Sequence, residues 1–73
     1  MEEYNPDLWD SELNDVLYKA VVDRMFDFSL IAVDVSNYII TAGLDRDFEL
    51  YTEKQCRYQW SRIHATREEV IHY

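Results

Sequence analysis

The chain has 73 residues, enough for one domain at most, and its single cysteine cannot form an internal disulfide. Two tryptophans, six tyrosines and three phenylalanines accompany only one glycine and one proline, which argues against a disordered chain and against a hairpin-rich β fold. The net charge of −8 arises almost wholly in residues 1–50, which carry −9, whereas residues 51–73 carry +1.

The chain begins with a polar leader, residues 1–8. Tyr4 and Leu8 within it are apolar enough to pack back on the rest of the protein. The domain itself is predicted at residues 9–65, and Trp9 would anchor the entry of the chain into the core.

A first helix is predicted at residues 11–24. Asp10 or Ser11 can cap its start, where a carboxylate also complements the helix dipole. Apolar residues then recur at the helical spacing of three and four: Leu13, Val16, Leu17, Ala20 and Val21.

A second helix is predicted at residues 28–41. Asp27 and Ser29 offer its cap, and Gly43 is well placed to end it in a left-handed conformation. Apolar residues again repeat at three and four: Ile31, Ala32, Val35, Tyr38 and Ile39. The many β-branched residues make a strand the competing interpretation for part of this segment, but the periodic stretch is too long for an ordinary strand.

A third helix is predicted at residues 52–65, after a charged connector. Thr52 and Gln55 have the spacing of a capping box, in which each side chain can bond the other's backbone N–H. An apolar stripe follows at Cys56, Trp60 and Ile63, and a basic, hydrogen-bonding face follows at Lys54, Arg57, Tyr58 and Ser61. Residues 66–73 could extend this helix or begin another segment, and their lack of a terminator suggests a fragment of a longer protein.

The ordered set of motifs resembles the Myb/SANT family over most of residues 9–63. The first helix matches the family's tryptophan, acidic residue and aliphatics with Trp9, Glu12, Leu17, Ala20 and Val21. The second matches its aromatic followed by Ile-Ala with Phe28, Ile31 and Ala32, phenylalanine replacing the usual tryptophan. The third matches its threonine cap and Gln-Cys-Arg-x-x-Trp core with Thr52, Gln55, Cys56, Arg57 and Trp60.

The resemblance implies an all-α, homeodomain-like bundle of three helices whose third helix is of the helix-turn-helix type. Because three short helices bury little area with aliphatic residues alone, we expect Trp9, Phe28 and Trp60 to meet at its centre. The predicted core comprises Trp9, Leu17, Val21, Phe28, Ile31, Ala32, Cys56, Trp60 and Ile63. The resemblance also implies an ion pair between Glu12 and Arg57, joining the first and third helices.

Two features depart from the usual family pattern. The interval from Phe28 to Trp60 is longer by about a dozen residues, as in the trihelix and MADF-like branches, so the helix-turn-helix geometry is altered. In addition, Gln59 stands where DNA-binding members often carry arginine before the last tryptophan.

The charge distribution favours a protein-interaction module over a DNA reader. A field this negative attracts basic partners and repels polyphosphate. We expect a histone tail or a basic segment of a complex partner to bind an acidic surface made of Asp10, Glu12, Asp15 and Asp23. This hypothesis implies a nuclear, chromatin-associated protein, although for any single carboxylate simple solvation is the expected role.

A Myb-like DNA-binding domain is the alternative. The third helix would then enter the major groove of double-stranded DNA. Its recognition face would comprise Lys54, Arg57, Tyr58, Ser61 and Arg62.

An enzyme is not expected, and neither is a cofactor, a metal or a membrane partner. His64 and His72 lack neighbouring ligands at metal-binding spacing, and Cys56 on an apolar stripe is expected to pack rather than react. No signal peptide and no apolar run of membrane-spanning length occurs, so we expect an intracellular protein. Homo-oligomerisation is a further possibility, through Tyr38, Ile39 and Ile40.

Overall fold

The computed structural model describes the backbone of residues 2–71 and the side chains of residues 2–64. It contains two short 3₁₀ helices and three α-helices, in the order η1 (Pro6–Leu8), α1 (Ser11–Asp23), α2 (Phe28–Ala42), η2 (Phe48–Leu50) and α3 (Glu53–Ile71). No strand occurs in the described residues. The predicted all-α class and the three helices are therefore confirmed, and residues 28–41 form a helix rather than a strand.

Local capping chemistry fixes the ends of α1 and α2 where the sequence predicts them. The Asp10 carboxylate accepts a hydrogen bond from the Leu13 N–H at 2.9 Å, and Asp27 accepts one from Leu30 at 3.5 Å. Gly43 ends α2 with φ +67°, the left-handed conformation that glycine adopts without steric cost.

Only half of the predicted capping box forms at the start of α3. The Thr52 hydroxyl accepts from the Gln55 N–H at 3.3 Å, but the Gln55 side chain does not return to Thr52. It bonds the backbone of Glu3 and Asn5 instead. At its other end α3 continues past the predicted stop at residue 65 and reaches Ile71.

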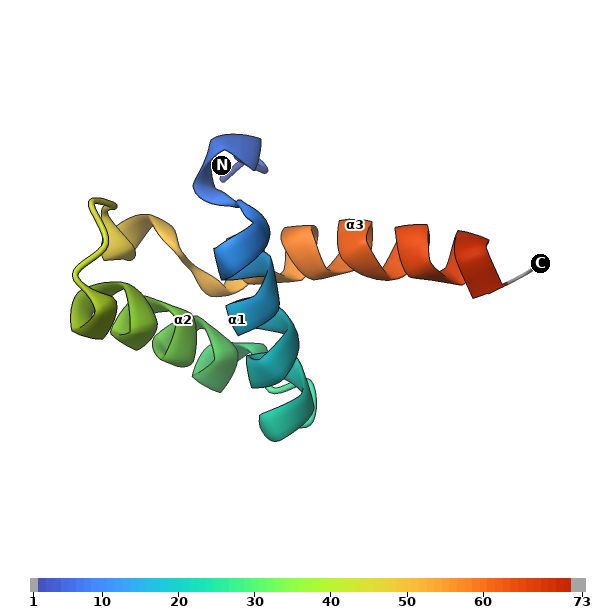
Figure 1. Cartoon of the computed structure of the whole chain (residues 1–73), viewed down its shortest axis with the longest axis horizontal. Helices are drawn as coiled ribbons and strands as arrows, with labels where there is room; N and C mark the ends of the chain where they lie inside the picture. The colour runs from blue at the N-terminus through green and yellow to red at the C-terminus, as the bar shows by residue number, and fades with distance from the viewer. Residues whose placement is uncertain (1, 72–73) are drawn as a thin grey trace.

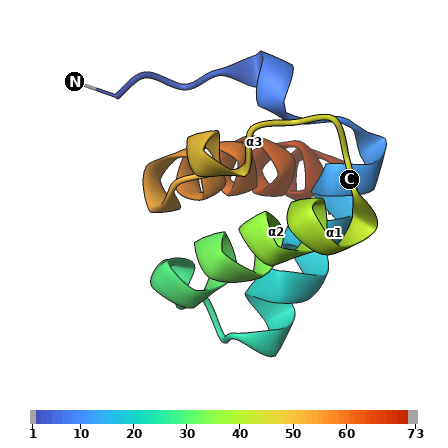
Figure 2. The same ribbon diagram turned by 90° about the vertical axis from the view of Figure 1, so that its left-hand side faces the viewer.

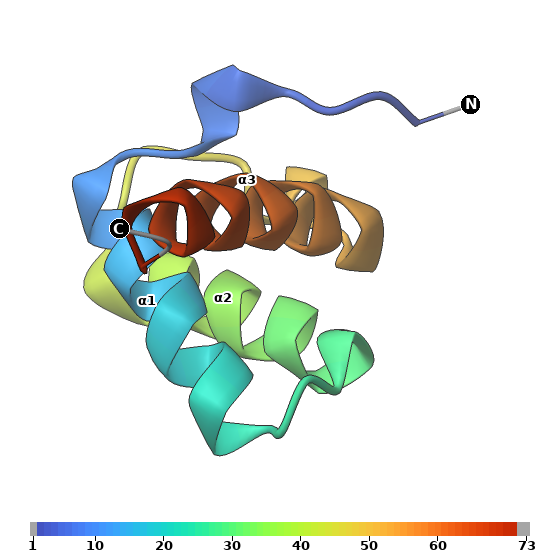
Figure 3. The ribbon, with the colours of Figure 1, turned by 90° about the vertical axis from the view of Figure 1, so that its right-hand side faces the viewer.

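The helix α2 packs against both α1 and α3, so it lies at the centre of the bundle's contacts. Figure 1 shows α3 crossing behind α1 and projecting beyond it toward the C-terminus. The residues ahead of α1 run along the side of α3 that faces away from α1 and α2, as Figures 2 and 3 show from opposite sides. We call residues 2–8 the N-terminal arm.

The centre of the core is mainly aliphatic. Of the predicted core, Leu17, Val21, Ile31 and Cys56 are fully buried, whereas the three large rings, Ala32 and Ile63 are half-buried at its edge. The other buried hydrophobic residues are Leu8, Leu13, Ala20, Val35, Ile39 and Tyr51.

The expected meeting of Trp9, Phe28 and Trp60 at the centre is wrong. Trp9 packs edge-on against Tyr51 with ring centroids 5.3 Å apart, and Phe28 lies beneath the Arg57 guanidinium at 5.3 Å. Trp60 packs instead against Tyr18 and Phe26, both at 5.9 Å. The stripes of α1 and α2 fill the centre with aliphatic side chains, so the rings close its edges.

Tyr51, in the connector before α3, is the aromatic residue that does reach the core. Its ring is almost fully buried and its hydroxyl donates to the Leu8 carbonyl. The Arg46 guanidinium donates to the Tyr51 hydroxyl at 3.2 Å and to the Leu8 carbonyl at 3.0 Å, and pairs with Asp10. The hydrogen bond to Tyr51 is the main cause that raises the pKa of Arg46. These bonds tie the connector to the start of α1.

Candidate functional site

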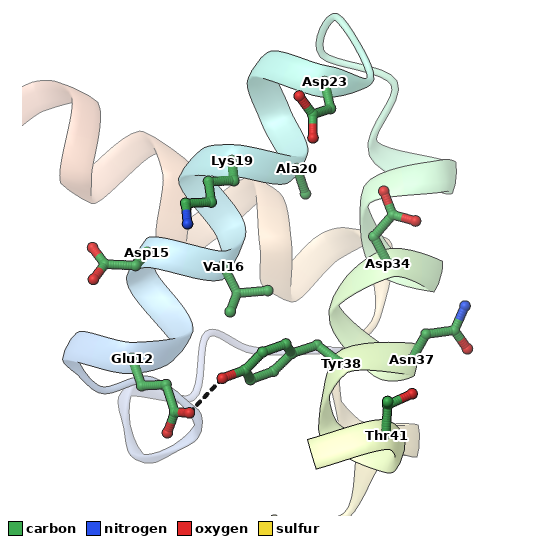
Figure 4. Close-up of a pocket in the computed structure, with 10 residues that line it drawn as sticks. All are labelled: Glu12, Asp15, Val16, Lys19, Ala20, Asp23, Asp34, Asn37, Tyr38 and Thr41. Carbon is green, nitrogen blue, oxygen red and sulfur yellow. Dashed lines mark hydrogen bonds between the residues drawn. The ribbon is translucent and has the colours of Figure 1, made fainter.

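A groove of about 620 Å³ runs between α1 and α2 and carries charged side chains on both walls. Figure 4 shows its floor, where Val16 and Ala20 of α1 lie opposite Tyr38 of α2. The other residues that line it are Glu12, Asp15, Lys19, Asp23, Asp34, Asn37 and Thr41. Four carboxylates and one ammonium group therefore line this surface, which we call the acidic groove.

The α1 wall follows directly from helical spacing. Glu12, Asp15, Lys19 and Asp23 recur at intervals of three and four, which places them along one side of the helix. In Figure 4 the Glu12 and Asp23 carboxylates mark the two ends of the groove, while Asp15 lies on its outer rim. Three of the four carboxylates predicted as an acidic surface are thus brought together.

The fourth, Asp10, lies outside the groove and is already engaged. Its carboxylate caps α1 and pairs with Arg46 at 2.5 Å. The prediction that Asp10 shares the acidic surface is therefore wrong. The helix start turns its side chain toward the backbone N–H groups and the connector.

The α2 wall contributes Asp34, which is held by an arginine at the end of α1. Two hydrogen bonds join Asp34 to Arg24, at 2.7 and 3.0 Å. These bonds lower the pKa of Asp34 and raise that of Arg24, so the pair stays ionised at neutral pH. Because Arg24 offsets Asp34, the charges left to attract a partner are Glu12, Asp15 and Asp23, against Lys19.

Tyr38 bridges the two walls at the other end of the groove. Its hydroxyl donates to the Glu12 carboxylate at 2.5 Å, as the dashed line in Figure 4 shows. This hydrogen bond is the main cause that raises the pKa of Tyr38. The Glu12 side chain is therefore held in position from α2.

The expected ion pair between Glu12 and Arg57 does not form. Glu12 faces α2 and bonds Tyr38, whereas Arg57 pairs with Glu53 at 2.8 Å, one turn earlier on its own helix. A partner one turn away is reached without any constraint from tertiary packing. Arg57 also lies over the Phe28 ring, so its guanidinium already has two partners, the Glu53 carboxylate and the Phe28 ring.

The predicted recognition face of α3 is partly covered by the N-terminal arm. Lys54 and Ser61 are exposed, and Lys54 also lines a depression of about 500 Å³ together with Glu53, Arg57 and Tyr58. The Tyr58 hydroxyl, however, donates to the Glu2 carbonyl, and Arg62 lies 4.9 Å from the centre of the Tyr4 ring.

Two buried glutamines hold the arm in this place. Gln55 accepts from the Asn5 N–H at 3.0 Å and donates to the Glu3 carbonyl. Gln59 accepts from the Tyr4 hydroxyl at 2.6 Å and donates to Asn14 of α1 at 2.7 Å. Their spacing of four residues is the available signal in the sequence, because it places two amide side chains on one face of the helix, where both can bond the same neighbouring segment.

Other candidate reactive groups are accounted for by packing. Burial is the main cause that raises the pKa of the Cys56 thiol to about 12, so the thiolate needed for nucleophilic chemistry is absent at neutral pH. His64 stacks on Trp60 at 5.8 Å. Within the described residues no cluster of three or more histidine, cysteine or acidic side chains could hold a metal ion. His72 lies outside the described residues.

The residues suggested for homo-oligomerisation do not share one surface. Ile39 is buried in the core and Tyr38 points into the acidic groove, so only Ile40 of the three is exposed. The helix turns its apolar stripe inward at Ile31, Val35 and Ile39, and a different set of residues faces outward.

Comparisons with protein families, with curated proteins and with solved structures found no match. In the described part of the chain, no helix combines the length and the apolar character required to cross a lipid bilayer.

Proposed function

We propose that this chain is a non-enzymatic interaction module, similar to Myb/SANT domains, that binds a basic segment of another protein in the acidic groove. The observation that carries the proposal is the groove itself, because it places Glu12, Asp15 and Asp23 on one wall with a single lysine among them. A histone tail or a basic segment of a complex partner has the complementary charge, and the setting would be nuclear and chromatin-associated.

The dimensions of the groove define the partner more closely. Glu12 and Asp23 are eleven residues apart on α1, which corresponds to about 16 Å along the helix axis. An extended peptide covers that distance with roughly five residues. A segment with cations at its two ends and an apolar residue between them would meet the carboxylates at the ends and the floor at Val16.

The test compares two double variants that change the net charge equally. Asp15→Asn with Asp23→Asn removes two groove carboxylates, and Asp7→Asn with Asp45→Asn removes two exposed carboxylates elsewhere. Binding of a labelled Lys/Arg-rich peptide is followed by fluorescence anisotropy at several salt concentrations.

We expect the groove variant to weaken binding by about 2- to 30-fold more than the control variant, since each exposed ion pair contributes roughly 0.2–1 kcal/mol. Affinity should also fall with added salt, because the charges are exposed and screened. Equal weakening by both double variants, or an affinity indifferent to salt, would overturn the proposal.

The second candidate is a DNA-binding domain that uses α3. The exposed Lys54 and Ser61 favour it, while Glu53 and the arm over Tyr58 lower the positive charge of that face. An NMR titration with a short duplex at low salt separates the two functions. Shifts confined to α3 would support the DNA reader, and shifts along α1 and α2 on adding the basic peptide would support the interaction module.

A further inference from the structure

The outward face of α2 carries an apolar stripe with no charge on it. Leu30, Val33 and Ile40 are each about half exposed, at 44%, 52% and 54%, and exposed Asn37 lies between them. The spacing of three, four and three residues is that of a helix–helix seam. An amphipathic helix that already buries Ile31, Val35 and Ile39 therefore has a second, opposite apolar side.

This face continues into a second groove, which ends at the connector. The groove has a volume of about 370 Å³ and lies between α2 and η2, with Val33 and Ile40 on one wall and Phe48 on the other. Phe48 and Leu50 of η2 are also exposed. Among the residues that line it, Glu49 is the one that carries charge.

Charge decides which partner can cover this face. Within α2 the only charged residue is Asp34, and it is bonded to Arg24 on the side toward α1. Two copies of a chain with net charge −8 repel each other wherever carboxylates meet. The α2 stripe itself carries no carboxylate, so two copies can meet there without placing like charges in the contact, and each copy supplies the uncharged apolar helix that the other needs.

We propose that the occupant is a second copy of this chain, packed through Leu30, Val33, Asn37 and Ile40 about a two-fold axis. A two-fold interface uses the same patch on both copies, and one self-complementary helix face meets that requirement. Asn37 then meets the seam, where a single asparagine sets the register of paired helices.

The dimer is weak. The stripe from Leu30 to Ile40 is about 15 Å long and about 10 Å wide, so even with the exposed Phe48 and Leu50 beside it the contact is at most a few hundred Å², below the roughly 800 Å² per partner of a standard interface. Self-association is therefore expected at protein concentrations on the order of 0.1–1 mM. It strengthens with added salt, because screening weakens the repulsion between copies and leaves apolar contact intact.

The experiment compares the wild-type chain with two variants that add one carboxylate each. Val33→Asp places the charge on the stripe, and Val22→Asp places it on α1, where the valine is 58% exposed. Sedimentation velocity at low and high salt gives the oligomeric state, amide shifts on dilution locate the contact, and circular dichroism shows that both variants are folded.

We expect a dimer at high salt for the wild-type chain and for Val22→Asp, with dilution shifts on α2 and η2, and a monomer for Val33→Asp. A wild-type chain that stays monomeric up to about 2 mM at high salt overturns the inference. So does equal association of the two variants, or loss of association in Val22→Asp. Because groove binding weakens with salt while this association strengthens, failure of one proposal leaves the other testable.

Discussion

The turn between α1 and α2 stores backbone strain that one substitution should release. The Met25 N–H bonds the Val22 carbonyl at 3.4 Å and the Phe26 N–H bonds the Val21 carbonyl at 3.1 Å, which is the Schellman pattern of a helix end. Glycine usually occupies the left-handed position of this motif. Here Met25 occupies it at φ +52°, and Phe26 follows at +68°.

The end of α2 provides an internal reference with the same hydrogen bonds. The Gly43 N–H bonds the Ile40 carbonyl at 3.2 Å and the Leu44 N–H bonds the Ile39 carbonyl at 3.1 Å. Gly43 has φ +67°, and apart from its two neighbours in the chain nothing lies within 4 Å of where a Cβ would stand. The two helix ends therefore share their hydrogen bonds but differ in the residue placed in the left-handed conformation, and the α1 end adds a second left-handed residue, Phe26.

Met25→Gly is expected to raise the free energy of unfolding by about 0.5–1 kcal/mol. Left-handed backbone costs a non-glycine residue roughly 1–2 kcal/mol, and the greater freedom of glycine in the unfolded chain offsets about 0.4–1 kcal/mol of that relief. Little burial is lost, because Met25 is 84% exposed. The reverse change, Gly43→Met, should lower stability by a similar amount.

The change in unfolding free energy of each variant is measured by urea denaturation. The dependence of the free energy on urea concentration should be the same as in the wild-type chain, and thermal melts are recorded in parallel. For a domain of this size the change corresponds to a rise in midpoint of roughly 2–8 °C for Met25→Gly. If Gly43→Met destabilises while Met25→Gly is neutral or worse, the Met25 backbone carries no removable strain and the reasoning fails.

Two further predictions concern the ion pair and the arm. Asp34→Asn should lower stability near neutral pH, because the bond to Arg24 lowers the pKa of Asp34 below the ordinary 3.8. That contribution is present above the ordinary pKa and is lost as the pH falls through the lowered one. The urea midpoints of wild type and variant should therefore converge as the pH falls below 3.8, and a gap independent of pH would contradict this. Gln59→Leu should cost about 1–3 kcal/mol by removing the partner of Asn14 and Tyr4, and should speed amide exchange in the N-terminal arm. Unchanged exchange there would show that the arm is held without Gln59.

The sequence predicts the helix ends of α1 and α2 well because those ends depend on neighbours along the chain. Asp10 and Asp27 cap with N–H groups three residues later, and Gly43 supplies a conformation that other residues adopt with strain. The strained turn at Met25 lacks the glycine that usually signals such an end. The hydrogen bonds of the helix end, together with tertiary packing, hold its conformation.

The contacts between helices are predicted less well from the sequence. Helical periodicity indicates which residues share one side of a helix, but it does not indicate which other element packs against that side. Glu12 was placed on the correct side of α1, but its partner proved to be Tyr38 across the groove rather than Arg57. Asp34 joined the acidic groove from α2, which no spacing along α1 could indicate. Tyr51 was missed as a core residue because it lies in a connector, where helical periodicity does not apply.

Position 59 connects the charge of α3 with the placement of the arm. Gln59 is buried and bonded to both Tyr4 and Asn14, at a position where an arginine would add a cation to α3. This neutral amide adds no positive charge to α3, and it ties down an arm whose Glu2 carboxylate accepts a hydrogen bond from Thr52. Both effects make the potential of that helix less positive, so a phosphate backbone gains less by approaching it. Neither effect touches the acidic groove, because Glu12, Asp15 and Asp23 line the groove between α1 and α2 and, among the side chains that the structure describes, form no bond to the arm. For this reason the proposed binding surface is the groove, and α3 serves as the element on which the arm is fixed.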